Sequence, residues 1–186
     1  MSTQPQTPPP RMTVDEFLAW AEDRPGRWEL FDGEPVMQAA ERAAQWEIKL
    51  AVQVALLNAV RAGSLDCHVV PDGATVRISD RTAYEPDALV YCGPKVDASS
   101  LLVGNPVVIV EVVSPSTSRR DHIRKLADYF RVPSVAHYLI IDPDQPLFIH
   151  HMRRDGGDIL TRIVREGAIA LDPPGMEVSM AEIYAS

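Results

Sequence analysis

The chain has 186 residues, of which 46% are hydrophobic and 24% charged, a balance typical of a folded globular protein and unlike that of a disordered one. Eighteen basic and 26 acidic residues give a formal net charge of −8 at pH 7, so the average field repels phosphate backbones and anionic lipids. A nucleic-acid role therefore requires a local basic patch or a metal ion.

The Gln/Pro/Thr-rich start of the chain predicts a flexible tail over residues 1–11, followed by a single domain over residues 12–186. No charged segment followed by an apolar one opens the sequence, and nowhere are 18 consecutive residues apolar. We therefore expect a soluble, cytoplasmic protein with no membrane partner. Cys67 and Cys92 are too few for a disulfide framework and form no C-x-x-C pair, which predicts reduced, buried thiols.

The first predicted elements are a short helix and a hairpin. Thr13 and Glu16 have the spacing of a capping box, and apolar residues then recur at helical spacing until Pro25. Asp32-Gly33 suits a tight turn between two short strands.

A long helix is predicted over residues 39–62, which contain no Pro or Gly. Its apolar residues recur every three or four positions, as one helix face requires: Trp46, Leu50, Val54, Leu57 and Val60. Strands are expected at 66–70 and 74–78, parted by a Pro-Asp-Gly turn.

The later elements predict a central sheet. Residues 87–91 and 107–113 are apolar runs typical of strands buried on both faces. Ser116, Thr117 or Ser118 then caps a helix that ends before Pro133, and strands at 136–142, 146–152 and 158–164 precede a helix after Ser179. This order predicts an α/β (α+β) fold, a mixed β-sheet flanked by helices.

Two carboxylates fall where a charge is costly. Asp87 begins one apolar strand and Glu111 is embedded in another, so each needs a partner. Together they can hold one hard cation such as Mg²⁺, which takes only one or two protein carboxylates. Alternatively, Asp87 caps a strand and Glu111 pairs with Lys125 or Arg120.

The helix after Glu111 brings further candidates. Asp121, Lys125 and Asp128 share a face away from the apolar stripe, so Lys125 can point toward Glu111. Near a metal-bound water, a lysine can orient the water, neutralise phosphate charge, or act as a base if its pKa is lowered. The alternative is a solvated Asp121–Lys125 pair.

The same helix carries candidate phosphate contacts. Arg119, Arg120 and Arg124 cluster near its start, where backbone N–H groups also favour anions; the alternative is a solvated basic face. His122 can touch phosphate or remain a solvated helix histidine. His150 and His151 are adjacent and so point to opposite faces of a strand, which argues against a zinc site.

The motifs together resemble one family. Those that carry the resemblance are WELFDGE from Trp28, YEPD from Tyr84, VEVVSPST from Val110, the residues Asp121, Lys125 and Tyr129, and YLIIDP from Tyr138. In this order they resemble the Uma-type family of restriction endonuclease-like proteins, within the PD-(D/E)xK nuclease superfamily.

The resemblance implies a restriction-endonuclease-like fold and roles for particular residues. Asp87 is the expected PD aspartate, Glu111 the second acid, and the Val112 carbonyl a third metal contact. Position 113, where the superfamily places its lysine, is valine, and Lys125 of the following helix matches the family's own lysine. Glu29 resembles an acidic residue that such nucleases bring from the N-terminal region; the alternative is an exposed strand residue.

The sequence departs from the family at Gln45, where members often carry a histidine, and glutamine cannot titrate. The function expected from the resemblance is a Mg²⁺- or Mn²⁺-dependent DNA endonuclease that acts as a homodimer, with the exposed strands near 146–164 as a possible interface. The alternatives are a non-catalytic nuclease-fold module that binds nucleic acid or a protein, and an enzyme acting on another phosphate ester.

Overall fold

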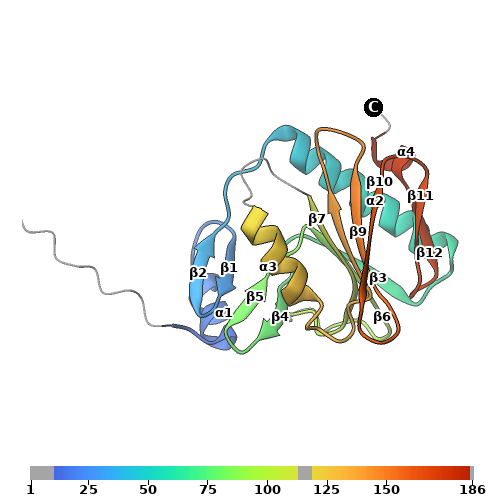
Figure 1. Ribbon diagram of the computed structural model, residues 1–186. Coiled ribbons are helices and arrows are strands. Elements are labelled where there is room, and N and C mark those ends of the chain that lie inside the picture. Colours follow the sequence, from blue (N-terminus) through green and yellow to red (C-terminus); the bar gives the residue numbers. More distant parts are fainter. Residues whose placement is uncertain (1–10, 113–118, 185–186) are drawn as a thin grey trace, which may run out of the picture.

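The computed structural model describes residues 11–112 and 119–184, without the side chains of residues 119 and 120 (Figure 1). Within these ranges there are four helices: α1 Val14–Glu22, α2 Ala43–Ala62, α3 Arg119–Tyr129 and α4 Met180–Tyr184. The strands are β1 Trp28–Phe31, β2 Glu34–Met37, β3 Cys67–Pro71, β4 Val76–Ser79, β5 Thr82–Tyr84, β6 Ala88–Cys92, β7 Pro106–Val112, β8 His137–Ile141, β9 Phe148–Arg153, β10 Ile159–Val164, β11 Ala168–Leu171 and β12 Met176–Ser179. The predicted mixed fold with helices flanking β-sheets is confirmed.

A six-stranded sheet forms the centre, in the order β10-β9-β8-β7-β6-β3. Its strands pair antiparallel except β7 and β8, which run parallel. Side chains alternate between its two faces, as strand geometry requires: Val90 and Val108 pack in a core with α2, whereas Leu89 and Ile109 pack in a core with α3. Figure 1 shows α2 and α3 on opposite sides of this sheet.

A smaller sheet, in the order β2-β1-β5-β4, carries the N-terminal elements. The predicted capping box between Thr13 and Glu16 is present at the start of α1. The Asp32-Gly33 turn also forms, with positive φ at both residues. A Cβ at position 33 would lie 2.8 Å from Cβ of Arg11, so this turn requires glycine.

Three short strands, β5, β11 and β12, were not expected from the sequence, because each has only three or four residues. The two strands around the Pro-Asp-Gly turn do form, but they do not pair with each other. β3 joins the six-stranded sheet and β4 the smaller one, so this turn passes the chain between sheets.

Helix α2 forms as predicted, but most of its predicted stripe is not the face that packs on the sheet. Trp46, Leu50, Val54 and Leu57 are exposed, and of that stripe only Val60 is buried. The packed face consists of Val52, Ala55, Leu56 and Val60. Because α2 is apolar nearly all round from Ala51 to Leu57, periodicity alone does not identify its buried face.

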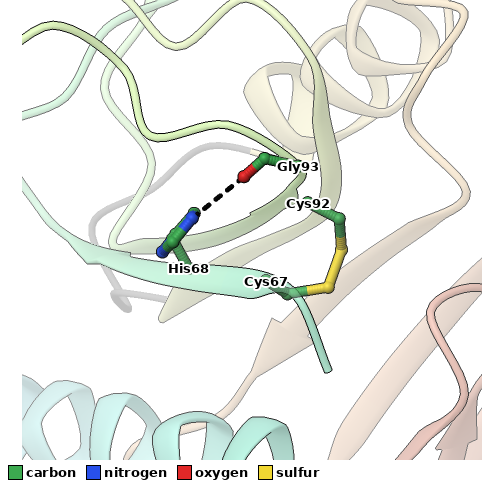
Figure 2. Close-up of a disulfide and its surroundings, with 4 residues drawn as sticks. All are labelled: Cys67, His68, Cys92 and Gly93. Carbon is green, nitrogen blue, oxygen red and sulfur yellow. Dashed lines mark hydrogen bonds between the residues drawn. A yellow bond between two sulfur atoms is a disulfide. The ribbon is translucent and has the colours of Figure 1, made fainter. Parts of the chain in front are cut away.

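The prediction of reduced, buried thiols is wrong. Cys67 at the start of β3 and Cys92 at the end of β6 are directly opposite in the antiparallel pair and form a disulfide (Figure 2). Both are half-buried. Beside them, the His68 ring nitrogen lies 3.0 Å from the Gly93 carbonyl oxygen, which also ties β3 to the end of β6.

Two predictions concern parts of the chain that fall outside the described residues: most of the N-terminal tail, and the capping of α3 by Ser116, Thr117 or Ser118. Arg11, placed in that tail, is described, and its guanidinium pairs with Asp32 at 2.7 Å. None of the helices in residues 11–112 and 119–184 has the length and apolar character needed to cross a membrane.

Candidate active site

The two candidate metal ligands lie on neighbouring strands because β6 begins where its antiparallel partner β7 ends. Asp87 immediately precedes β6, and its backbone N–H donates to the Val110 carbonyl at 3.0 Å. The Val112 N–H donates to Oδ2 of Asp87 at 2.6 Å. This backbone ladder holds the Asp87 carboxylate beside the end of β7, where Glu111 lies.

Lys125 reaches Glu111 from α3, as the helix spacing predicts. Its Nζ lies 3.0 Å from Oε1 of Glu111 and 2.9 Å from Oε1 of Glu29, and Lys125 is only 6% exposed. Tyr129, one turn later, donates its hydroxyl to the same Glu111 oxygen at 2.7 Å. The alternative of a solvated Asp121–Lys125 pair is wrong, since Asp121 pairs with Arg124 and Lys125 is buried.

Glu29 is brought to this cluster by the small sheet. It lies on β1 and accepts from Lys125 and from the backbone N–H of Glu85, the latter at 3.1 Å. Glu29 is buried, so the alternative of an exposed strand residue is wrong. Asp87, Glu111, Lys125 and Glu29 therefore converge from four separate elements or their ends.

A second buried lysine, Lys49 on α2, was missed by the sequence analysis. Its Nζ lies 2.6 Å from Oδ1 of Asp87 and also contacts Glu41. Arg27 completes this side, with Nε 2.7 Å from Glu85 and Nη2 3.7 Å from Asp87. The only signal available in the sequence was that Lys49 shares a helix face with residues three and seven positions later, Val52 and Leu56.

Negative charge exceeds positive charge in this cleft. Among the described residues, its ion-pair network contains six carboxylates and three cations. The carboxylates are Glu29, Glu41, Asp72, Glu85, Asp87 and Glu111, and the cations are Arg27, Lys49 and Lys125. A divalent cation would offset this excess.

The excess of negative charge in the cleft affects the pKa values of Asp87 and Glu111, the two candidate metal ligands. Burial and the charge of Glu111 raise the pKa of Asp87 to about 6, although Lys49 opposes the shift. Burial also raises the pKa of Glu111, against the influence of Lys125. Both carboxylates thus lack part of the positive charge that would hold them ionised in a buried place.

The surroundings of Lys125 favour its charged form, in contrast to those of Asp87 and Glu111. Burial favours its neutral form, but Glu111 and Glu29 outweigh burial and raise the pKa of Lys125 well above its ordinary value. An ammonium held this firmly is a charge-stabilising and hydrogen-bonding group. Of the three roles predicted for Lys125, orientation of water and neutralisation of phosphate charge fit this state, whereas a general base requires a lowered pKa.

The carboxylates open into a polar cavity of about 80 Å³, lined by residues that include Gln45, Asp87, Glu111, Val112, His122 and Lys125. This is room for several waters or a hydrated ion. No described residue bonds to Oε2 of Glu111, and Asp87 keeps lone pairs beyond those used by Val112 and Lys49. Hard carboxylate oxygens are the donors that Mg²⁺ and Mn²⁺ prefer.

Glu41, Glu85 and Asp121 also line the cavity, but in residues 11–112 and 119–184 no group of three or more His, Cys, Asp or Glu side chains is arranged to hold a metal. A metal held by Asp87 and Glu111 would therefore have two side-chain carboxylates. This fits Mg²⁺, which commonly keeps several waters and binds one or two carboxylates together with substrate phosphate.

Of the residues predicted to contact phosphate, His122 lines the cavity and Arg124 does not. Arg124 does not line the cavity: it pairs with Asp121 at 2.7 Å and its guanidinium lies 3.5 Å from the centre of the Phe31 ring. The side chains of Arg119 and Arg120 are outside the described residues. His122 does line the cavity, and its buried Nε2 has no hydrogen-bond partner among the described residues, which argues against a merely solvated histidine.

Gln45, at the position where the resemblance to the family implies a histidine, also lines the cavity. Its Oε1 accepts the backbone N–H of Arg42 at 3.0 Å, so this side chain helps to begin α2.

The fold and this cluster of acids and lysines define a nuclease-like protein. The chain belongs to the Uma2 family, described as "Putative restriction endonuclease", which it matches over residues 14–181. The resemblance drawn from the motifs is therefore confirmed.

Two relatives and one solved structure are similar to the chain over most of its length. The chain is 25% identical over 182 residues to an uncharacterised protein of Synechocystis, covering 97% of this chain and 95% of the relative. A second uncharacterised Synechocystis protein is 27% identical over 161 residues, covering 84% and 90%. The crystal structure of a "putative nuclease belonging to DUF820" from Anabaena variabilis shares the fold, with a TM-score of 0.74, 14% identity, and coverage of 94% of this chain and 98% of that one.

Proposed function

We propose that the protein is a Mg²⁺- or Mn²⁺-dependent DNA endonuclease. The observation that carries the proposal is the convergence, in one cavity, of Asp87 and Glu111 with raised pKa values and of buried Lys125 bonded to Glu111. Perturbed carboxylates beside a lysine in a polar cleft are typical of metal-assisted phosphoryl chemistry.

Asp87, Glu111 and the Val112 carbonyl are the proposed metal ligands. A bound divalent cation supplies a water of lowered pKa and neutralises charge on the phosphate. The chain's own residues act around it: Val112 N–H and Lys49 hold the Asp87 carboxylate in place, and Glu29 and Tyr129 fix Lys125 and Glu111 relative to each other. Lys125 then faces the reacting phosphate as a cation.

The proposed reaction is hydrolysis of a phosphodiester. The oxygen of a water attacks phosphorus and the water releases one proton to solvent. The bond from phosphorus to the 3′ oxygen breaks, and that oxygen takes up one proton from solvent. The products are a 5′-phosphate and a 3′-hydroxyl, the outcome implied by the superfamily resemblance. Arg119, Arg120 and Arg124 are the proposed contacts to the DNA backbone, and His122 is a further candidate within the cavity.

We also propose that the protein works as a homodimer, because one cavity per chain cuts one strand and a duplex has two. Its proposed location is the cytoplasm, where the Cys67–Cys92 disulfide would have to persist under reducing conditions.

Cleavage assays test the proposal directly. Supercoiled plasmid and single-stranded DNA, each incubated with Mn²⁺ or Mg²⁺, should be cut by the wild type and not by Glu111→Gln, and the new ends should accept ligation without added phosphate. Equal cleavage by both proteins would contradict the assignment. Small phosphate diesters tested as competitors distinguish DNA from another ester as substrate.

A non-catalytic nuclease-fold module is the second candidate. It is favoured by one observation: Asp87, Glu111 and Glu29 all have cationic partners within the chain, so the cluster is also a coherent structural ion-pair network. Metal affinity separates the two candidates, since a purely structural network has no need of a cation.

A further inference from the structure

Strand β10 forms one edge of the six-stranded sheet, and most of its residues are exposed. β10 pairs with β9 along one side, and in the described parts of the chain no strand pairs with its other side. Five of its six residues are exposed, including Leu160 and Ile163. An uncovered edge bearing apolar side chains is a template for another strand.

Next to this edge lies an apolar groove of about 480 Å³ between β10 and α3. Ile123 and Leu126 of α3 line one wall together with Phe130, which follows the helix, and Ile159 and Thr161 of β10 line the other. Ile123 on α3 is 63% exposed, and Ile163 on β10 is 66% exposed. Exposed apolar groups gathered in this way mark an interaction surface.

We propose that a second copy of the chain binds this edge, with β10 pairing antiparallel to β10 across a two-fold axis perpendicular to the sheet. Such an axis keeps the α3 side of both copies on the same face of one continuous sheet. The two sheets then merge, and each copy places side chains beside the groove of the other.

The orientation of the β10 side chains restricts the register. Thr161 points to the α3 face, since its hydroxyl lies 2.8 Å from Nδ1 of His151, whose ring stacks on Tyr138. Ile159 and Ile163 share that face, and Leu160, Arg162 and Val164 point to the other. Under the two-fold axis only residues on the same face can lie opposite each other, so the axis must pass through a residue and not between two.

Two registers overlap the strands almost completely, centred on Thr161 or on Arg162, and charge decides between them. A centre on Arg162 places the two Arg162 guanidinium groups against each other and Ile159 opposite Arg165. A centre on Thr161 instead pairs Ile159 with Ile163 of the second copy and puts Asp158 diagonally across from its Arg162. Each register contains one apolar pair repeated by the symmetry, Ile159–Ile163 with the centre on Thr161 and Leu160–Val164 with the centre on Arg162. The complementary charges therefore decide in favour of Thr161.

This interface deepens the proposed homodimer but does not depend on the nuclease reaction. The dimer is measured without metal or DNA, so its failure is distinct from a failure of cleavage.

Sedimentation velocity at micromolar concentrations tests the surface. The wild type should have twice the 20.6 kDa chain mass. In the proposed register, Ile163→Lys places a charge opposite the apolar Ile159 of the other copy, and the two-fold symmetry repeats this change. We therefore expect the dissociation constant of the dimer to rise about 100-fold, a factor of about ten for each copy. The matched control is Leu50→Lys on the exposed side of α2, which should remain dimeric. A monomeric wild type, or a dimer lost in Leu50→Lys and kept in Ile163→Lys, overturns the proposal.

Crosslinking tests the register. Both native cysteines are bonded to each other, so an introduced cysteine is the only free thiol. Thr161→Cys, at the proposed axis, should form a covalent dimer when diamide oxidises the two thiols to a disulfide. Ile163→Cys is the control, because its two copies would be offset by four residues, about 14 Å, too far for a disulfide. Crosslinking of Ile163→Cys as readily as Thr161→Cys overturns the register.

Discussion

Replacing Lys49 with methionine removes a buried ammonium and keeps a side chain of similar length. The lysine is 4% exposed, lies 2.6 Å from Asp87 and 3.5 Å from Asp72, and also contacts Glu41. Its loss leaves the Asp87 carboxylate buried beside Glu111 with only the more distant Arg27 as a cation. Removal of one partner from a buried ion pair costs about 3–5 kcal/mol.

This cost is large enough to measure in unfolding experiments. For a chain of this size each kcal/mol lowers the melting temperature by about 2–4 °C, so Lys49→Met should melt roughly 6–20 °C below the wild type. Thermal unfolding followed by circular dichroism, in the presence of EDTA, gives the value, and urea unfolding gives the free energy independently.

Lys95→Met is the matched control, because Lys95 is the one exposed lysine of the three in the chain. Its free energy of unfolding should stay within about 0.5 kcal/mol of the wild type. A Lys49→Met protein as stable as Lys95→Met would refute the reasoning that Lys49 compensates the buried Asp87 charge.

Three further predictions follow from the site and the disulfide. Asp87→Asn and Glu111→Gln should abolish metal-dependent cleavage and leave the circular dichroism spectrum unchanged. Lys125→Ala should lower the cleavage rate more than it lowers the metal affinity. A Glu111→Gln protein that still cleaves would exclude Glu111 as a metal ligand. The pKa of Asp87 is raised in the folded state from 3.8 to about 6, so the metal-free folded state binds more protons than the unfolded state around and between these values. The free energy of unfolding should therefore fall by about 3 kcal/mol as pH rises from roughly 3 to 7. Urea unfolding across this range should show a smaller fall in Asp87→Asn, and equal pH profiles would contradict the shift. The Cys67–Cys92 disulfide closes a loop of 25 residues, so its reduction should lower the free energy of unfolding by about 3 kcal/mol. Thermal unfolding with and without a phosphine reductant measures this loss. An unchanged melting temperature would show that the disulfide does not stabilise the fold.

Local signals in the sequence were enough to predict much of the fold. The capping box at Thr13, the Asp32-Gly33 turn and the apolar strands that follow Asp87 and surround Glu111 depend on neighbouring residues, and each formed as predicted. The approach of Lys125 to Glu111 also follows from local geometry, because helix spacing fixes which side chains share a face.

The features that the sequence did not reveal depend on packing between distant segments. Lys49 reaches Asp87 only because the face of α2 that carries Lys49 packs toward the sheet. The sequence does not show which face of α2 is buried, because the helix is apolar nearly all round from Ala51 to Leu57. The disulfide required knowledge that Cys67 lies opposite Cys92, a register set by the whole β3–β6 pair. The burial of Glu29 likewise depends on how the small sheet packs beside α3.

Calorimetric titration of Mn²⁺ or Mg²⁺ into the wild type and Asp87→Asn, with and without a phosphate mimic, tests the central claim most directly because it needs no knowledge of the DNA substrate. A cation site on Asp87 and Glu111 predicts binding by the wild type, strengthened by the mimic, and its loss in Asp87→Asn. Equal binding by the two proteins would place the metal elsewhere. No binding by the wild type even with the mimic would contradict the metal-dependent nuclease and leave the ion-pair network as a structural feature.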